Sequence, residues 1–259
     1  DLRLDWRSQP GGEPPQPRTL AARVTDIEFV ADDVTRVYLQ LPAGKRLPFW
    51  AGQYIDVLLQ DEARRSFSLA NPPHDDECLE LHIRRVAGGR FTEYVFEQMR
   101  PGTWLRFEGP LGQFYLREDS ARPVILVAGG TGFAPIKSII EYALTASIDR
   151  SVEFYWGAGT VQGIYLDHKA AHWQSADRDK AVPRLSYTPV VAGATPEDDW
   201  QGRQGMVHEA VLADHRDLSA YDVYLAGPPP MIEAAKDAFA KHGLDPQRLF
   251  YDSFVVNNS

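Results

Sequence analysis

Two glycine-rich turns each follow an apolar run that is typical of a buried strand. The first, Gly129–Gly132, leads into a helix whose first turn holds Pro135. Glycine lets a backbone approach a ligand closely, and a helix start offers N–H groups and partial positive charge to an anion. The second, Gly227–Pro230, also joins a strand to a helix. A plain tight turn explains either one alone, but two turns at strand ends favour nucleotide binding.

Two segments of the N-terminal half have residue types that suit a phosphate. In Arg64–Asn71, Phe67 follows Arg65 by two residues, so on a strand both side chains share one face. A guanidinium can bind phosphate through two hydrogen bonds, and an aromatic ring can lie against a flat cofactor. Gly88–Thr92 opens a helix, which makes a second anion site. Without context, a solvent-facing arginine and an ordinary turn remain the simpler interpretations.

The elements that must position these turns change character along the chain. Residues 20–116 consist mostly of short strands between Gly/Pro turns, which indicates an antiparallel barrel or sandwich with one helix at Arg90–Met99. From Pro123, apolar strands alternate with helices, which indicates a parallel sheet covered on both faces. The five strands predicted there span residues 123–128, 151–158, 185–191, 222–226 and 248–254. The helices predicted between them span residues 135–144, 164–174, 205–215 and 230–243.

The predicted fold class is therefore β followed by α/β, an antiparallel barrel and then a doubly wound five-stranded parallel sheet. We expect a residual N-terminal segment and linker at residues 1–17, a barrel domain at 18–118 and a nucleotide-binding domain at 119–259. The linker prediction rests on Gln9–Pro17, where four prolines and two glycines favour an extended spacer. The chain begins at Asp1 without an initiator methionine, which suggests a fragment of a longer protein.

Composition and charge exclude several classes of protein. The net charge of −9 argues against nucleic-acid binding, and no apolar run approaches the length of a membrane span. The single cysteine, Cys78, excludes both an internal disulfide and a four-thiolate iron–sulfur cluster within this chain, and it suits a reducing cytoplasm. His168 and His172 stand at a spacing that can bind zinc, but a solvated helix face is the better interpretation, so no metal site is predicted.

Taken in order, these segments resemble the ferredoxin–NADP reductase superfamily, whose FAD barrel precedes a pyridine-nucleotide domain. The segments that carry the resemblance are Arg65–Ser68, Gly89–Thr92, Gly109–Gly112, Gly129–Gly132 and Ala226–Pro229. The likeness covers roughly residues 18–254 and is more specific than any single motif. Within the superfamily, residues 69–74, 79–86 and 129–141 are similar to reductase components of bacterial aromatic and alkane hydroxylases and to CDP-6-deoxyglucoseen-type reductases.

The resemblance implies a role for particular residues. Those implied to bind FAD are Arg65, Ser66, Phe67, Ser68, His82, Ile83, Arg84, Gly89, Arg90, Phe91 and Thr92. Those implied to receive the nicotinamide nucleotide are Gly130, Thr131, Gly132, Gly227 and Pro228. Those implied to act at the reacting rings are Ser68, Thr131 and Phe254. Three positions depart from the family pattern: Phe67 replaces tyrosine, Thr92 replaces serine, and Ala226 replaces a cysteine that lies close to the nicotinamide.

The implied activity is that of an FAD-dependent reductase, which takes a hydride from NADH and passes electrons to a separate redox partner. That partner would be an oxygenase component or an iron–sulfur centre, with a [2Fe-2S] cluster only if a ferredoxin domain is present elsewhere. In the family, the 2′-phosphate of NADPH is usually bound by an arginine or lysine just past the second strand of the nucleotide domain. The corresponding segment Gly157–Gly163 holds no basic residue, which predicts a preference for NADH. Two alternatives stay open: a reductase of free flavin, and a non-catalytic subunit, which Ala226 favours.

Overall fold

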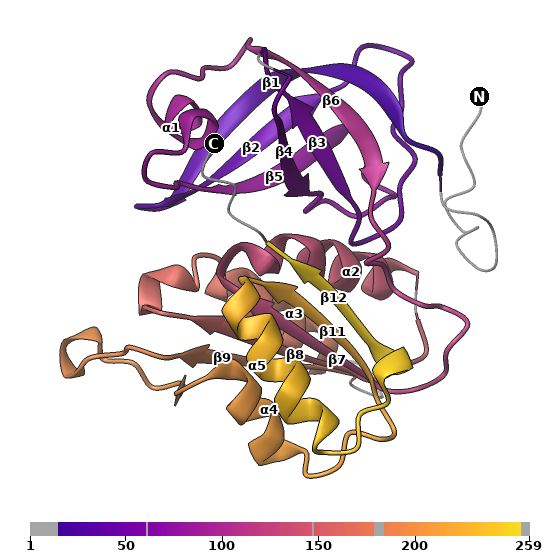
Figure 1. Ribbon diagram of the computed structural model, residues 1–259, viewed down its shortest axis with the longest axis vertical. Coiled ribbons are helices and arrows are strands. Elements are labelled where there is room, and N and C mark those ends of the chain that lie inside the picture. The colour runs from indigo at the N-terminus through magenta and orange to yellow at the C-terminus, as the bar shows by residue number, and fades with distance from the viewer. Residues whose placement is uncertain (1–14, 61, 147, 179–183, 255–259) are drawn as a thin grey trace. The chain divides into compact units, whose positions relative to one another are not determined.

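The computed structural model describes residues 15–60, 62–146, 148–178 and 184–254. Most of the predicted N-terminal segment and linker, residues 1–14, lies outside the described residues. The described chain forms two compact units, each built around its own six-stranded sheet (Figure 1).

The first sheet is antiparallel, as the closely spaced strand pattern predicts. Its strands are β1 (Arg18–Ala31), β2 (Val34–Gln40), β3 (Tyr54–Leu58), β4 (Arg64–Ser68), β5 (Cys78–Arg84) and β6 (Trp104–Leu111). They are ordered β4-β3-β6-β1-β2-β5, and a bridge between Leu69 and Leu81 joins the two edges. Helix α1 (Arg90–Glu97) ends two residues earlier than the pattern predicts.

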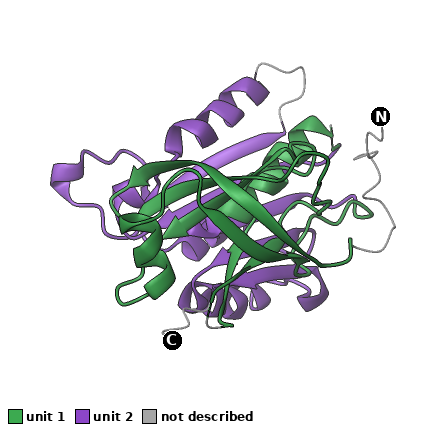
Figure 2. Ribbon diagram, turned by 90° about the horizontal axis from the view of Figure 1, so that it is seen from above, with its two compact units in different colours: residues 1–120, 134–148, 257–259 green, residues 121–133, 149–256 purple. Residues whose placement is uncertain are grey.

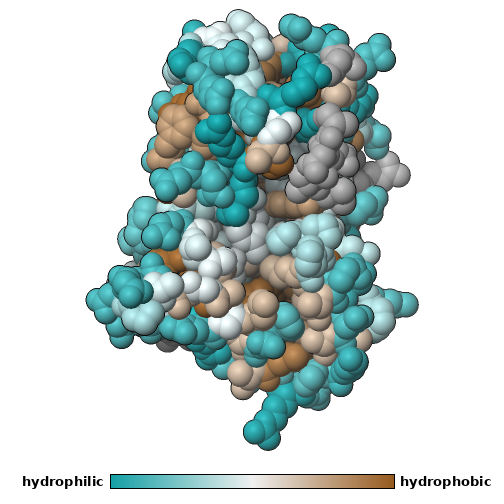
Figure 3. Space-filling model, turned by 60° about the vertical axis from the view of Figure 1, so that its left-hand side comes forward, coloured by the Kyte–Doolittle hydropathy of each residue, from teal (hydrophilic) through white to brown (hydrophobic). Residues whose placement is uncertain are grey.

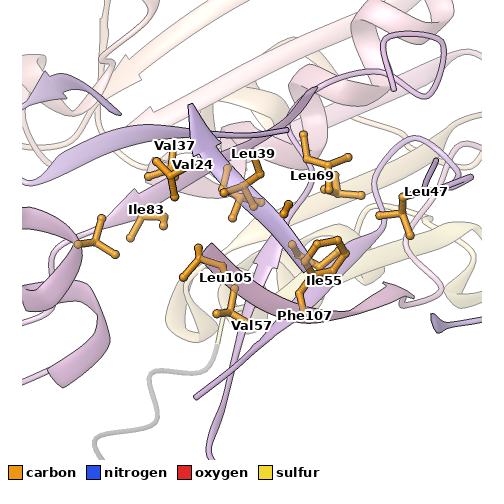
Figure 4. Close-up of a cluster of buried hydrophobic side chains, with 14 of the residues drawn as sticks. Val24, Val37, Leu39, Leu47, Ile55, Val57, Leu69, Ile83, Leu105 and Phe107 are labelled. Atoms are coloured by element: carbon orange, nitrogen blue, oxygen red, sulfur yellow. The ribbon is translucent and has the colours of Figure 1, made fainter. Parts of the chain in front are cut away.

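Alternating apolar side chains of these strands fill the interior of the barrel (Figure 4). Val24, Val37, Leu39, Ile55 and Phe107 are all fully buried. Since successive strand residues point to opposite faces, the intervening residues are left for the outer surface. The barrel therefore has a continuous apolar core that fixes the register of β4 and β5.

The second sheet is parallel throughout and confirms the predicted alternation of strands and helices. Its strands are β7 (Val124–Gly129), β8 (Val152–Ala158), β9 (Leu185–Val191), β10 (Arg203–Gln204), β11 (Asp222–Gly227) and β12 (Leu249–Ser253). They are ordered β10-β9-β8-β7-β11-β12, so β10 is a two-residue edge strand added to the five predicted strands. The order reverses beside β7, where doubly wound sheets bind ligands.

The helices of this half of the chain are α2 (Phe133–Thr145), α3 (Asp167–Arg178), α4 (Val207–Asp214) and α5 (Pro229–Ala240). Short 3₁₀ turns are η1 (Gly130–Gly132), η2 (Val161–Gly163), η3 (Pro196–Asp198) and η4 (Pro246–Arg248). The helix predicted at residues 164–174, after β8, starts at Asp167 instead, because residues 161–163 form η2 first. Among the described residues, no helix is long and apolar enough to cross a membrane.

Helix α2 belongs by packing to the antiparallel unit. Of the residues that the structure describes, the first unit comprises those within 15–120 and 134–148, and the second comprises those within 121–133 and 149–254 (Figure 2). The helix therefore starts at the end of a glycine turn of the second unit but packs with the first. On the face shown in Figure 3, hydrophilic side chains predominate with smaller apolar areas between them. In the described part of the chain, the large hydrophobic side chains that stay exposed are Phe29, Trp104, Met206 and Tyr251.

Candidate flavin and nucleotide sites

Strand β4 presents Arg65 and Phe67 on one face, as the sequence predicts. Arg65 pairs with Val57 and Phe67 pairs with Ile55 in the antiparallel ladder with β3. The Phe67 ring packs against the barrel core, with its centroid 5.6 Å from that of Phe91 on α1. Both side chains are only partly buried, so each keeps a surface that a bound cofactor can contact.

The two serines of β4 lie on the other face of the strand. The Ser66 side chain is exposed and donates to Asp56 Oδ1 at 2.6 Å. Ser68 is 7% exposed and stands where the strand ends. The next residue, Leu69, donates its N–H to Gln53 O at 2.9 Å. The hydroxyl of Ser68 is thus held at the edge of the barrel by main-chain hydrogen bonds on its C-terminal side.

The α1 turn is built for glycine at its cap. Gly89 is the N-cap of α1, and a Cβ there would lie 2.8 Å from Thr92 Oγ1 and 3.0 Å from Val86 O. The Thr92 hydroxyl donates to Gly89 O at 3.0 Å, which closes the turn. The first N–H groups of a helix have no acceptor within it, and those of Arg90 and Phe91 lie at this start. The turn can accept an anion through its backbone.

The β5 residues of the implied flavin set have different surroundings. Ile83 is fully buried in the barrel core, and the His82 side chain is fully buried among polar groups on the opposite face. Contacts of these two residues with a flavin are therefore limited to their backbone. The Arg84 guanidinium lies 3.4 Å from Asp33, and its buried Nε–H has no acceptor within the described chain. An unpaired buried donor costs free energy, so this N–H suits a bound phosphate or carbonyl group.

Glu80 is the centre of a buried charge cluster on the outer face of β5. Its Oε1 accepts from Arg36 Nε at 2.9 Å and lies 2.8 Å from His82 Nε2, and its Oε2 accepts from Lys137 Nζ at 2.9 Å. Burial by itself would raise the pKa of Glu80, but the hydrogen bond with His82 and the charges of Lys137 and Arg36 outweigh it and lower the pKa. Burial lowers the pKa of His82, so the imidazole is neutral near pH 7.

This cluster predicts a loss of stability in acid. Both groups have a folded-state pKa below the ordinary value, 6.5 for the histidine and 4.5 for the glutamate, so the unfolded chain binds more protons on acidification. The contribution of His82 is complete above pH 6.5 and is lost below it, and that of Glu80 is complete above pH 4.5 and is lost below it. Denaturant unfolding from pH 8 to 5 should show a falling free energy of unfolding, and His82→Asn should flatten that fall. Equal slopes in the two proteins would contradict this assignment.

In the parallel unit, the two glycine turns pack backbone to backbone. A Cβ on Gly132 would lie 1.9 Å from Ala226 O, and one on Gly227 would lie 3.0 Å from Gly129 Cα. Gly130 has φ +54° and Gly227 has φ +155°, conformations that disfavour other residues. The predicted turns therefore meet at the carboxyl ends of neighbouring strands, β7 and β11.

Two side chains that the sequence analysis missed hold these turns in place. The Trp156 indole donates to Gly130 O at 3.0 Å, and its ring stacks on Phe133 with centroids 3.9 Å apart. A Cβ on Gly129 would lie 2.4 Å from Met231 Sδ, so the thioether fills the space beside that glycine. A buried tryptophan needs an acceptor for its N–H, and this need is the signal in the sequence that could have indicated Trp156.

The remaining predicted residues lie close to these turns. Thr131 is partly exposed in η1. Phe254 follows β12 and donates its backbone N–H to Gly227 O at 2.9 Å, so the C-terminal aromatic is tied to the second turn. Pro228 is exposed and is the N-cap of α5. Ala226 is fully buried. Three segments, η1, the β11–α5 turn and the residue after β12, thus meet at the ends of β7 and β11.

Comparison with known proteins agrees with this organisation. Residues 21–115 match the family model described as "Oxidoreductase FAD-binding domain". Residues 126–237 match the model described as "Oxidoreductase NAD-binding domain". The matched segments contain β4, β5 and α1 in the first case and both glycine turns in the second.

Full-length relatives extend the same result. The chain is 39% identical to the CDP-6-deoxy-L-threo-D-glycero-4-hexulose-3-dehydrase reductase of Yersinia pseudotuberculosis, over 98% of this chain and 74% of that protein. It is 35% identical to reductase component 1 of terephthalate 1,2-dioxygenase from Comamonas, over 99% of this chain and 74% of that protein. The crystal structure of the Amycolatopsis cytochrome P450 reductase GcoB superposes with a TM-score of 0.84 at 33% identity, covering 93% of this chain and 71% of that one.

A barrel with an FAD-binding match and a parallel sheet with an NAD-binding match define a flavoprotein reductase. The chain belongs to the ferredoxin–NADP reductase superfamily, among the reductases that act as electron-transfer components.

Proposed function

We propose that this chain oxidises NADH by means of FAD held on the antiparallel unit and passes the electrons to a separate one-electron acceptor. The acceptor is an iron–sulfur protein or domain, or an oxygenase component, as the names of the relatives suggest. The observation that carries the proposal is the close packing of Gly132 and Gly227 at the ends of adjacent strands. The backbone N–H groups of this glycine turn are donors for the phosphates of a dinucleotide. The single cysteine suits a cytoplasmic setting.

The residues of the first unit fit FAD. The buried Nε–H of Arg84, the guanidinium of Arg65 and the start of α1 supply donors for a diphosphate and for polar ring atoms. Phe67 supplies an aromatic surface for the ring system, and Ser68 supplies a hydroxyl at the end of β4. When bound, FAD accepts two electrons as a hydride and releases them singly. The protein binds and orients, and no strong acid or base is required.

In the second unit, Gly130–Gly132 receives the nucleotide through its backbone, and Thr131 offers a hydroxyl beside it. Gly227 and Pro228 would lie beside the nicotinamide half, and the absence of a Cβ at Gly227 lets this turn pack closely against Gly129 and Met231. Phe254 donates its N–H to Gly227 O, which supports a role for its ring in covering a cofactor ring at that end. Ala226 adds no thiol, so hydride transfer proceeds here without the cysteine of the family pattern.

Stopped-flow spectroscopy tests the proposal. The chain should stay yellow through gel filtration with FAD, bleach on mixing with NADH, and recover its colour with ferricyanide. Retention of FAD separates it from a reductase of free flavin, which releases its flavin. An FAD-loaded chain that NADH does not bleach would instead be the non-catalytic subunit that Ala226 favours.

Nucleotide preference forms a separate prediction. The turn after β8 runs from Gly157 to Gly163 without a lysine or arginine, and a Cβ on Gly159 would meet nothing within 4 Å. NADH should therefore give a higher kcat/KM than NADPH. The exposed Thr160 is the test position: Thr160→Arg should raise kcat/KM for NADPH about tenfold, since a charge-assisted hydrogen bond contributes roughly 1.5–3 kcal/mol. Preference for NADPH in the wild-type chain would overturn the assignment.

A further inference from the structure

Helix α2 sends two buried polar side chains to the segment that follows β4. The Lys137 ammonium donates to Ala70 O at 3.0 Å, and the Ser138 hydroxyl donates to Asn71 O at 2.8 Å. Lys137 is 3% exposed and Ser138 is fully buried. Two consecutive residues of α2 therefore hold two consecutive carbonyl groups of the barrel.

The ammonium of Lys137 has all its hydrogen bonds satisfied. Besides Ala70 O, it donates to Glu80 Oε2 at 2.9 Å and to Glu141 Oε2 at 2.8 Å. A lysine has three N–H donors, and these three acceptors use them all. A buried charge is stable only when it is paired and hydrogen-bonded, so this position is specific for a cation of this reach.

The other side of the same segment is held by the barrel itself. Ala70 donates its N–H to Glu80 O at 2.8 Å, and Glu80 donates its N–H to Asn71 Oδ1 at 2.9 Å. The barrel thus binds the N–H of Ala70 and the side-chain oxygen of Asn71, and α2 binds the carbonyl groups of both residues. Ser68, the end of β4, lies two residues before the carbonyl that Lys137 binds.

We propose that Lys137 and Ser138 are positioning residues of the flavin site. Both residues lie in the segment 126–237, which matches the NAD-binding family model, and not in the segment 21–115, which matches the FAD-binding model. They fix the segment Ser68–Asn71 and thereby the hydroxyl and strand end that contact the flavin ring. This inference rests on the proposed function, which puts Ser68 at the flavin.

The test uses Lys137→Met, Lys137→Arg and Ser138→Ala in the full chain, with the exposed Lys241→Met as matched control. The measurements are the FAD dissociation constant, the visible flavin spectrum, and the limiting rate and KM for reduction by NADH. Lys137→Met should lower the limiting rate about tenfold and shift the flavin band, with KM for NADH unchanged, because a misplaced active-site group lowers the rate by such factors. Lys137→Arg should recover part of the rate, and Lys241→Met should match the wild type.

The outcomes separate this inference from the proposed function. Suppose that NADH bleaches the wild-type chain, so that the proposed function stands. A Lys137→Met variant with the spectrum, FAD affinity and limiting rate of the wild type would then overturn the inference alone. If NADH failed to bleach the wild type, the proposed function would fall, and the FAD affinity and spectrum of the variants would still decide the positioning role. Should Lys137→Met not fold, Ser138→Ala carries the decision: a shifted flavin band supports the inference, and an unchanged spectrum and rate overturn it.

Discussion

Replacing Gly132 by alanine is expected to slow flavin reduction by NADH about 10- to 100-fold. A Cβ there would lie 1.9 Å from Ala226 O, closer than any two such atoms can approach, and the obstacle is backbone of β11. Either η1 or the end of β11 must move, and overpacking of this kind costs about 1–3 kcal/mol. The shifted turn would hold the nucleotide out of position, and a misplacement of about 1 Å can lower a rate about 100-fold, which gives the expected range. Stopped-flow bleaching at saturating NADH measures it.

Gly159→Ala is the matched control for this change. It introduces the same methyl group into the same unit, but that methyl meets nothing within 4 Å. It should therefore leave the limiting rate within about twofold of the wild type, as surface substitutions away from special features do. The FAD content of both variants should match the wild type, because both changes are in the second unit. Equal rates for Gly132→Ala and Gly159→Ala would show that the turn does not bind the nucleotide.

Replacing Arg65 by alanine is expected to weaken FAD binding about 10- to 100-fold. The guanidinium lies on the same face of β4 as Phe67 and is only partly buried, so a diphosphate can reach it. A hydrogen bond to a charged group contributes about 1.5–3 kcal/mol, and its loss gives this range. Fluorescence titration of the apoprotein with FAD measures the change, and the rate of hydride transfer at saturating FAD should change less.

Arg64→Ala provides the comparison. Arg64 precedes Arg65 on β4, but its side chain is exposed on the opposite face, where it pairs with Glu108 and Asp56. An exposed ion pair contributes about 0–1 kcal/mol, so removing this one should barely alter FAD affinity. If Arg64→Ala weakened FAD binding as much as Arg65→Ala, the two guanidinium groups would act through general surface charge, and Arg65 would have no specific role.

The features that the sequence predicted well are those set by local pattern. A strand is predicted by the apolar run of β7, a turn by the glycines after it, and a helix start by the prolines that open α5. The period-two alternation of β4 likewise fixed the shared face of Arg65 and Phe67, which the ladder with β3 confirms. Local periodicity determines which face a side chain occupies, so these predictions needed no knowledge of the tertiary structure.

The features that the sequence could not predict depend on residues far apart in the chain. Lys137 and Glu80 are 57 residues apart, and nothing in the composition around either one indicates that they pair. His82 is an example of the same difficulty: the resemblance implied that it lines the flavin edge, and only the structure shows that its side chain also contacts Glu80. Trp156 was overlooked because its acceptor, Gly130 O, belongs to another strand end.

Helix α2 has a practical consequence for protein engineering. A chimera that joins this barrel to the parallel sheet of another reductase at the boundary between residues 120 and 121 would contain the α2 of the other protein. Unless the donor supplies a lysine and a serine at positions 137 and 138, Glu80 and the Asn71 carbonyl would lose their partners in the recombinant protein. Such a chimera should therefore take residues 134–148 from the same protein as the barrel, even though these residues lie in the segment that matches the NAD-binding family model.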